Sequence, residues 1–140
     1  MRCLGLDIGD KRIGVALSDP EGILASPFAI IDRRDNSLDI KAITDIISQQ
    51  QVGQIVVGLP RSLDGSLGQQ AEKVQDFTQK LSEQIKIPVE YRDERLTTVM
   101  AERLGRVGGK KTKRKARHDA QAAALILQGY LDEGREPGLP

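Results

Sequence analysis

Acidic residues at three distant places in the sequence are the strongest candidates for chemistry. Asp7 lies within the apolar run that opens the chain, Asp93 and Glu94 are neighbours near the end of a later run, and Asp119 precedes an alanine-rich segment. A carboxylate inside an apolar strand must be hydrogen-bonded, paired or bound to a cation, because desolvating it alone is costly. Asp7 is therefore the first candidate for an active-site acid, and stabilisation of a turn at Gly9 is the alternative role.

Asp93 and Glu94 compete for a place beside Asp7. Neighbouring residues of a regular strand point to opposite faces, so only one of the two carboxylates is expected to join Asp7. Strand alternation groups Asp93 with Val89 and favours Asp93, although a strand end can also twist or bulge. A surface acidic pair matched to neighbouring arginines is the alternative.

Asp119 falls at the start of a helix that we expect over residues 118–133. Its position continues an apolar stripe that includes Ala123 and Ile126, so its side chain is expected to face a sheet. In the first turn of a helix a carboxylate also interacts favourably with the helix dipole, which is the alternative role for Asp119.

Carboxylates brought together from distant segments repel one another unless cations neutralise them. Hard oxygen ligands of this kind suit Mg²⁺ or Mn²⁺. Two such ions about 4 Å apart could activate water and stabilise the leaving oxygen during phosphodiester hydrolysis. The acids therefore favour a hydrolase that is a metal-dependent nuclease.

Basic residues are concentrated just before Asp119. The chain has a formal net charge of +1, and six positive charges lie within residues 110–117, so the remainder carries −5. These residues are Lys110, Lys111, Lys113, Arg114, Lys115 and Arg117. Such a loop can follow the phosphates of a nucleic acid, and a solvated loop without a ligand is the alternative. With 3% aromatic residues and no Trp, the chain is poorly equipped to stack many unpaired bases.

Apolar patterns place these residues in an α/β fold. We expect strands at residues 3–9, 12–19, 25–31, 54–59 and 89–91. We expect helices at 38–47 with a cap at Asn36 or Ser37, at 71–85, from Thr97 or Thr98 onward, and at 118–133. Because the two internal helices can connect parallel strands, a mixed five-stranded sheet with helices on both faces is the economical arrangement. This is the ribonuclease H-like order of elements.

Length and composition limit the class of protein. With 140 residues, 39% hydrophobic and 29% charged, residues 1–140 are expected to form a single globular domain. The single cysteine, Cys3, excludes an intramolecular disulfide. No apolar run approaches the roughly 20 residues that span a bilayer, so we expect a cytoplasmic protein without a membrane partner.

Four segments together resemble the YqgF/RuvX family of Holliday junction resolvase-like nucleases, which are similar to RuvC. They are residues 5–16, residues 56–60 with Asp64 and Gly65, residues 93–98, and Asp119 with Ala120. The order and spacing match over nearly the whole chain. The resemblance implies a ribonuclease H-like fold, Mg²⁺ or Mn²⁺ as cofactor, and a role in maturing the 5′ end of precursor 16S ribosomal RNA.

The same resemblance assigns catalytic and metal-binding roles to Asp7, Glu94 and Asp119. It thereby selects Glu94 over Asp93. Positions that the resemblance makes candidates for phosphate contacts are Lys11, Arg12, Arg61, Ser62 and Arg95, for which surface charge or turn chemistry is the alternative.

Other functions fit parts of the pattern. A Holliday junction or other branched DNA is an alternative substrate. A resolvase that cuts two symmetric strands needs two active sites, so a homodimer is expected in that case and a monomer suffices for RNA trimming. A noncatalytic factor could bind ribosomal RNA through residues 110–117. An ATP-using phosphotransferase would explain Asp7 and Gly9 before a turn, but the chain is too short for a second, adenosine-holding domain.

Overall fold

The computed structural model describes residues 1–60, 68–93 and 111–134, with the side chains of the last helix described from Ala120 to Glu133. The strands are β1 (Arg2–Ile8), β2 (Arg12–Ser18), β3 (Ala25–Asp32), β4 (Val52–Leu59) and β5 (Val89–Asp93). The helices are α1 (Asn36–Gln50), α2 (Gln69–Glu83) and α4 (Lys111–Gly134). Among these residues no helix has the length and apolar character needed to cross a membrane.

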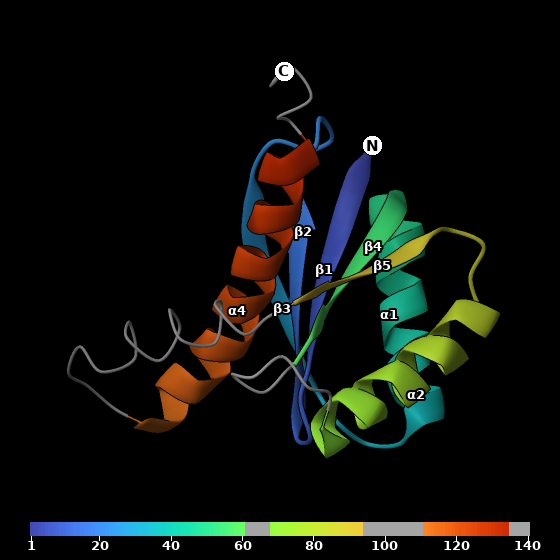
Figure 1. Cartoon of the computed structure of the whole chain (residues 1–140), viewed down its shortest axis with the longest axis vertical. Coiled ribbons are helices and arrows are strands. Elements are labelled where there is room, and N and C mark those ends of the chain that lie inside the picture. Colours follow the sequence, from blue (N-terminus) through green and yellow to red (C-terminus); the bar gives the residue numbers. More distant parts are fainter. Residues whose placement is uncertain (61–67, 94–110, 135–140) are drawn as a thin grey trace.

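The strands form one mixed sheet in the order β3-β2-β1-β4-β5. Strands β1, β2 and β3 are joined antiparallel by short turns, whereas β4 and β5 lie parallel to β1 because α1 and α2 provide the crossovers. Figure 1 shows α1 and α2 on one face of the sheet and α4 on the other. The expected five-stranded mixed sheet with helices on both faces is confirmed.

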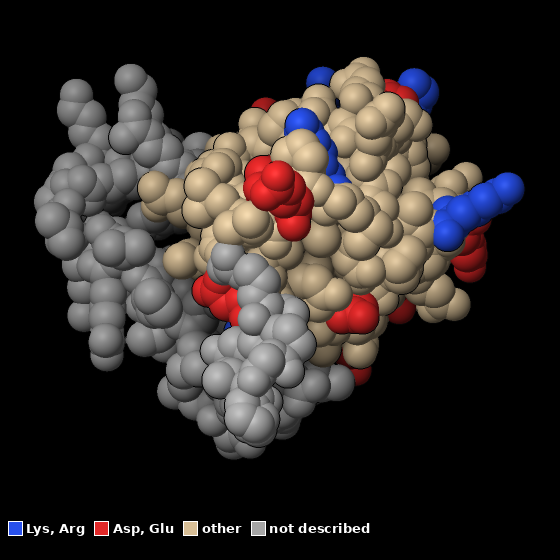
Figure 2. Space-filling model, turned by 90° about the horizontal axis from the view of Figure 1, so that it is seen from above, with Lys and Arg blue, Asp and Glu red and all other residues tan. Residues whose placement is uncertain are grey.

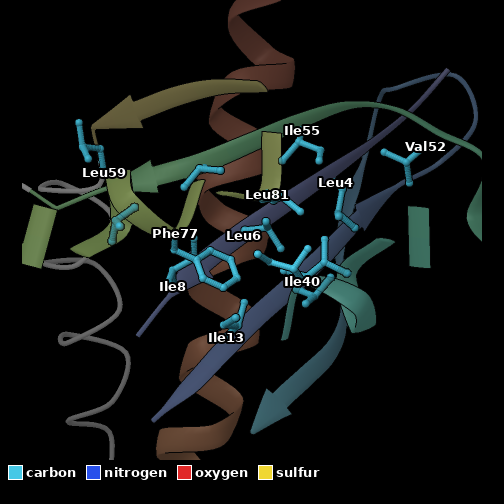
Figure 3. Packing of buried hydrophobic residues seen from close by; sticks show 14 of the residues in the cluster. Leu4, Leu6, Ile8, Ile13, Ile40, Val52, Ile55, Leu59, Phe77 and Leu81 are labelled. Carbon is cyan, nitrogen blue, oxygen red and sulfur yellow. The ribbon is translucent and has the colours of Figure 1, made fainter. Parts of the chain in front are cut away.

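The larger core lies between the sheet and the pair α1 and α2 (Figure 3). Alternate residues of the three central strands point into it, which is the two-residue period of a strand with one face on a core. These residues are Leu4, Leu6, Ile8, Ile13, Val15, Leu17, Ile55, Val57 and Leu59. Ile43 and Leu81, both fully buried, close this core from the helices. Burying each such side chain stabilises the fold by about 1.5–3 kcal/mol.

The core beneath α4 is thinner and is built from smaller side chains. Cys3, Ala16 and Val56 from the sheet meet Ala123 and Leu127 of α4. The face of β1 that carries Cys3 also carries Gly5, as the strand alternation predicts. Small residues on both sides allow the helix to approach the sheet closely.

Two helix boundaries differ from the sequence expectation. Helix α1 is capped by Asp35 and not by Asn36 or Ser37, because the Asp35 carboxylate accepts a hydrogen bond of 2.8 Å from the backbone N–H of Leu38. The helix ends at Gln50 and is capped by Gln51, whose left-handed backbone has φ 55° and whose N–H donates to the carbonyl oxygen of Ile47.

The last helix starts seven residues earlier than expected, at Lys111 rather than at position 118. Residues 111–117 are therefore helical and not a loop. The expectation failed because it depended on apolar periodicity, which this basic segment lacks, although Lys, Arg and Ala are good helix formers. Asp119 consequently lies in the third turn of α4, where the helix-dipole role proposed as an alternative does not apply. The helix expected from position 97 lies outside the described residues.

Candidate active site

Asp7 lies on the face of the sheet covered by α4, near the carboxyl end of the central strand. On β2 its partner across the antiparallel ladder is Gly14. On β4 the parallel register pairs Leu6 with Val57, so Gly58 follows beside Asp7. The Asp7 carboxylate therefore stands between two residues that have no side chain.

Asp7 is half-buried, and neither glycine beside it contributes a side chain to this face. A carboxylate at such a position has the donor chemistry that a divalent cation prefers. The turn that follows is held by other groups, since the N–H of Gly9 donates to the carbonyl oxygen of Arg12 at 2.9 Å. A Cβ at Gly9 would lie 2.8 Å from that oxygen, so the tight turn requires glycine.

Asp93 lies on the opposite face of the sheet from Asp7. In the β4–β5 register Asp93 pairs with Leu59, whose side chain points into the core beneath α1 and α2. Residues paired across a ladder share a face. Alternation therefore counts against Asp93 as the partner of Asp7, contrary to the sequence expectation, because Val89 and Asp7 belong to different faces.

The other two candidate acids fall where side chains are not described. Glu94 lies outside the described residues, and Asp119 is placed only by the backbone of α4. Within the described residues no group of three or more His, Cys, Asp or Glu side chains could hold a metal ion. The hard carboxylate of Asp7 suits Mg²⁺ or Mn²⁺, and Asp7 is the one acid of the three whose side chain the structure describes.

Helix α4 is joined to the far edge of the sheet by Arg92. The guanidinium forms an ion pair with Glu133 and packs over Gly129, where a Cβ would lie 2.8 Å from Nε of Arg92. Nearby, the Tyr130 hydroxyl donates to Glu90, and desolvation followed by the Glu90 charge raises the pKa of Tyr130 above its ordinary value. These contacts, which the sequence analysis missed, hold α4 across the sheet.

A second group of contacts holds the turn after Asp7. Nη1 of Arg33 donates to the carbonyl oxygen of Gly9 at 2.8 Å, and Nε of Arg33 donates to the Asp39 carboxylate at 2.7 Å. The Arg33 guanidinium also lies 5.0 Å from the centroid of the Phe77 ring. Asp39 is 1% exposed, so this ion pair is buried and unites the turn with both helices of the main core. The sequence feature that comes nearest to predicting this ion pair is the acidic residue Asp39 in the first turn of α1.

The candidate phosphate-binding residues are only partly described. Lys11 is exposed in the turn, and Arg12 is half-buried with its Nε 3.6 Å from Asp32. Arg61, Ser62, Arg95 and Lys110 lie outside the described residues, and Lys111, Lys113, Arg114, Lys115 and Arg117 are placed only by the backbone of α4. On the face that Figure 2 shows, the described basic and acidic side chains are scattered among uncharged ones.

Comparison with known proteins identifies a family. The family model named RuvX, described as Holliday junction resolvase, matches residues 1–133. A protein of Desulforamulus reducens is 47% identical over 135 residues, which cover 96% of this chain and 98% of that protein. A protein of Synechococcus elongatus is 48% identical over 135 residues, covering 96% of this chain and 91% of that protein. Both carry the name "Putative pre-16S rRNA nuclease".

Solved structures share the fold at low sequence identity. The chain is similar to Thermus thermophilus RuvC in complex with a Holliday junction, with a TM-score of 0.59, 12% identity and 96% of each chain covered. The yeast mitochondrial Holliday junction resolvase matches with a TM-score of 0.54 and 11% identity, covering 96% of this chain and 81% of the other. The expected ribonuclease H-like fold is confirmed.

Proposed function

The chain belongs to the RuvX family, and on that premise we propose that it is a nuclease that hydrolyses phosphodiester bonds of precursor 16S ribosomal RNA in the cytoplasm. The support for this substrate is the name carried by relatives that share nearly half of their residues with this chain over almost its full length. We propose further that residues 1–140 form one nuclease domain.

The observation that carries the proposal is the Asp7 carboxylate, half-buried in an apolar central strand with a glycine beside it on each neighbouring strand. Elsewhere on this face of the sheet, side chains such as Cys3 and Ala16 are covered by α4. At Asp7 the neighbouring strands contribute Gly14 and Gly58, which add no side chain of their own to this face. An acid kept in an apolar strand is more typical of a functional site than of packing.

Three acids are proposed as metal ligands: Asp7, Glu94 and Asp119. The exclusion of Asp93 from Asp7's face supports Glu94. The close packing of α4 on β1 at Gly5 supports Asp119, because this contact is one turn of helix away from Asp119. When bound, Mg²⁺ or Mn²⁺ supplies an activated water and stabilises the leaving oxygen. The residues of this chain supply the negative charge that holds the ions and the surface that orients the phosphodiester.

Basic residues are proposed to hold the substrate backbone. Lys111 precedes Asp119 by eight residues in one continuous helix, which is about 12 Å at 1.5 Å per residue. The basic segment of α4 is therefore close enough to the site to bind phosphates next to the one that is cleaved. Arg12, which begins β2, is proposed to bind a phosphate on the other side of Asp7.

A branched DNA is the second candidate substrate. It is favoured by the description of the matching family model as Holliday junction resolvase. Symmetric cutting of such a junction needs two active sites, so this activity requires a homodimer, whereas RNA cleavage by a monomer does not. Sedimentation of the purified protein with and without each substrate separates these two cases.

Cleavage by the full-length protein with Mg²⁺ or Mn²⁺ tests the proposal on both substrates. We expect cleavage of a precursor 16S ribosomal RNA fragment. We expect Asp7→Asn to reduce the rate by at least about 100-fold, because replacing a residue that only supports a metal ligand already costs up to about 100-fold. Asp45→Asn is the matched control, because Asp45 is an exposed aspartate on α1.

If the wild-type protein cleaves no faster than Asp7→Asn, the proposed enzymatic function is contradicted. In that case, loss of RNA binding on replacing the six basic residues of 110–117 by serine would identify a noncatalytic RNA-binding factor. Preferential cleavage of a four-way DNA junction would identify the second substrate.

A further inference from the structure

A shallow apolar hollow lies beside the proposed active site, on the edge strand β3. We propose that it is a subsite for one unpaired base next to the cleaved phosphate, with Phe28 as the ring on which the base stacks. The inference rests on the proposed nuclease function for the position of the cleaved bond. The ligand class is a single-stranded nucleic acid, and the chemistry recognised is the flat face of a nucleobase.

The sheet register places the hollow close to Asp7. Gly14 of β2 pairs with Asp7 on one side and with Ile30 of β3 on the other. Adjacent strands lie about 4.8 Å apart, so the backbone at Ile30 is roughly 10 Å from the backbone at Asp7. Ala120 and Gln121 close the hollow from α4, immediately after Asp119. The distance suits a nucleotide that neighbours the one held at Asp7.

The lining of the hollow suits a base and not a charged group. Its volume is about 280 Å³, and its walls are Pro27, Phe28, Ala29, Ile30, Ala120 and Gln121. None of these residues is charged, and only Gln121 can form side-chain hydrogen bonds. Phe28 is 44% exposed, although Phe is among the residues most often found fully buried. An exposed ring on an apolar floor is the arrangement that stacks bases without sequence preference.

An irregularity in β3 presents the ring. Val15 pairs with Ala29 and Ala16 with Pro27, so Phe28 is an extra residue in the ladder. Bulges of this kind re-aim a side chain and often lie next to active sites. Pro27 also lacks an N–H donor, so this edge is poorly suited to pairing with a strand of a second copy.

Arg12 can bind a phosphate that flanks Asp7 on the side away from the hollow, because Arg12 pairs with Asp32 and the hollow lies at residues 27–30 of β3. It lies two residues before Gly14 on β2 and so shares the face of Gly14 and Asp7. Its ion pair with Asp32 spans 3.6 Å, and the Asp32 side chain is 84% exposed. An exposed pair of this kind is weak, so the guanidinium can exchange its carboxylate partner for a phosphate.

The test measures binding of the full-length protein to a single-stranded oligonucleotide, in RNA and DNA forms, by fluorescence anisotropy. A second set of oligonucleotides carries an abasic site at each position in turn. We expect Phe28→Ala to raise the Kd roughly 10-fold, within the range for loss of one base–aromatic stack. Phe28→Tyr should restore binding. At one abasic position the wild-type protein and Phe28→Ala should bind equally.

Tyr91→Ala is the matched control. Tyr91 is 43% exposed on the opposite edge strand and pairs with Val57, which places it on the α1 and α2 face. The control should bind every oligonucleotide with the wild-type Kd. Thermal unfolding of each variant verifies the fold.

Three results would overturn the subsite. The first is an unchanged Kd for Phe28→Ala. The second is a Phe28→Ala protein that binds more weakly than the wild-type protein at every abasic position. The third is a change of oligomeric state in Phe28→Ala, which would identify a self-association surface. Cleavage separates this inference from the proposed function. A protein that cleaves RNA with an unchanged Kd for Phe28→Ala keeps the nuclease and loses the subsite. If the wild-type protein and Phe28→Ala bind equally at one abasic position but no cleavage occurs, the subsite is supported and the nuclease function is contradicted.

Discussion

Replacing Gly5 by alanine tests whether the contact between α4 and β1 positions the active site. A Cβ on Gly5 would lie 2.8 Å from the Cβ of Leu127 and 2.9 Å from the carbonyl oxygen of Ala123. Non-bonded carbon atoms pack at about 3.5–4.0 Å, so α4 must retreat from β1 by roughly 0.7 Å or more. The contacted atoms are a backbone carbonyl oxygen and a Cβ, both fixed to the helix. No flexible side-chain end can therefore move aside to relieve the contact.

The expected loss of stability follows from overpacking. Inserting a methyl group into a well-packed core costs about 1–3 kcal/mol. The lower entropy of the unfolded chain returns roughly 0.4–1 kcal/mol when glycine becomes alanine. The net destabilisation should therefore be roughly 0–2.6 kcal/mol with a central value of about 1.3 kcal/mol, a fall in Tm of a few degrees that circular dichroism can measure.

Activity should fall further than stability alone explains. At temperatures where Gly5→Ala remains folded, displacement of α4 should separate the proposed metal ligands Asp119 and Asp7. A misplacement of about 1 Å can cost roughly 100-fold in rate, so kcat/KM should decrease by that order. Gly53→Ala is the matched control, since the atoms nearest to its Cβ would belong to the flexible Met1 side chain. A Gly5→Ala protein with wild-type Tm and wild-type cleavage would refute the idea that α4 packs tightly on β1.

Two further predictions concern charged and titrating groups. Arg33→Ala leaves the Asp39 carboxylate buried without its ion partner and should destabilise the fold by about 3 kcal/mol in urea unfolding, the low end for a broken buried pair. Arg33→Lys should recover only part of this stability. Equal stability of the wild-type protein and both variants would contradict the prediction. The raised pKa of Tyr130 means that its stabilising effect is complete below the ordinary tyrosine pKa of about 10 and is lost as pH rises through the folded-state value. Tyr130→Phe should therefore lose less stability than the wild-type protein between pH 9 and 11, and parallel losses would show that Tyr130 does not titrate with unfolding.

The sequence by itself predicted most of the elements and proposed the first acid. Alternating apolar residues predicted the strands, and the helical spacing of Ile40, Ile43 and Ile47 predicted α1, because these periods are local consequences of backbone geometry. The same alternation places Asp7 with Cys3 and Gly5 on the face beneath α4. Resemblance to a family added Glu94 and Asp119, and all three acids stay proposals.

Only the tertiary structure decided how these elements meet. The register of β4 with β5 puts Asp93 on the face opposite Asp7, and no local pattern could assign those faces to particular helices. The contacts of Arg33 with Gly9 and of Arg92 with Glu133 join residues distant in sequence or in different elements. Such contacts depend on three-dimensional packing and not on a repeating spacing. For the same reason, the placement of Asp7 between two glycines became visible only when three strands were placed side by side.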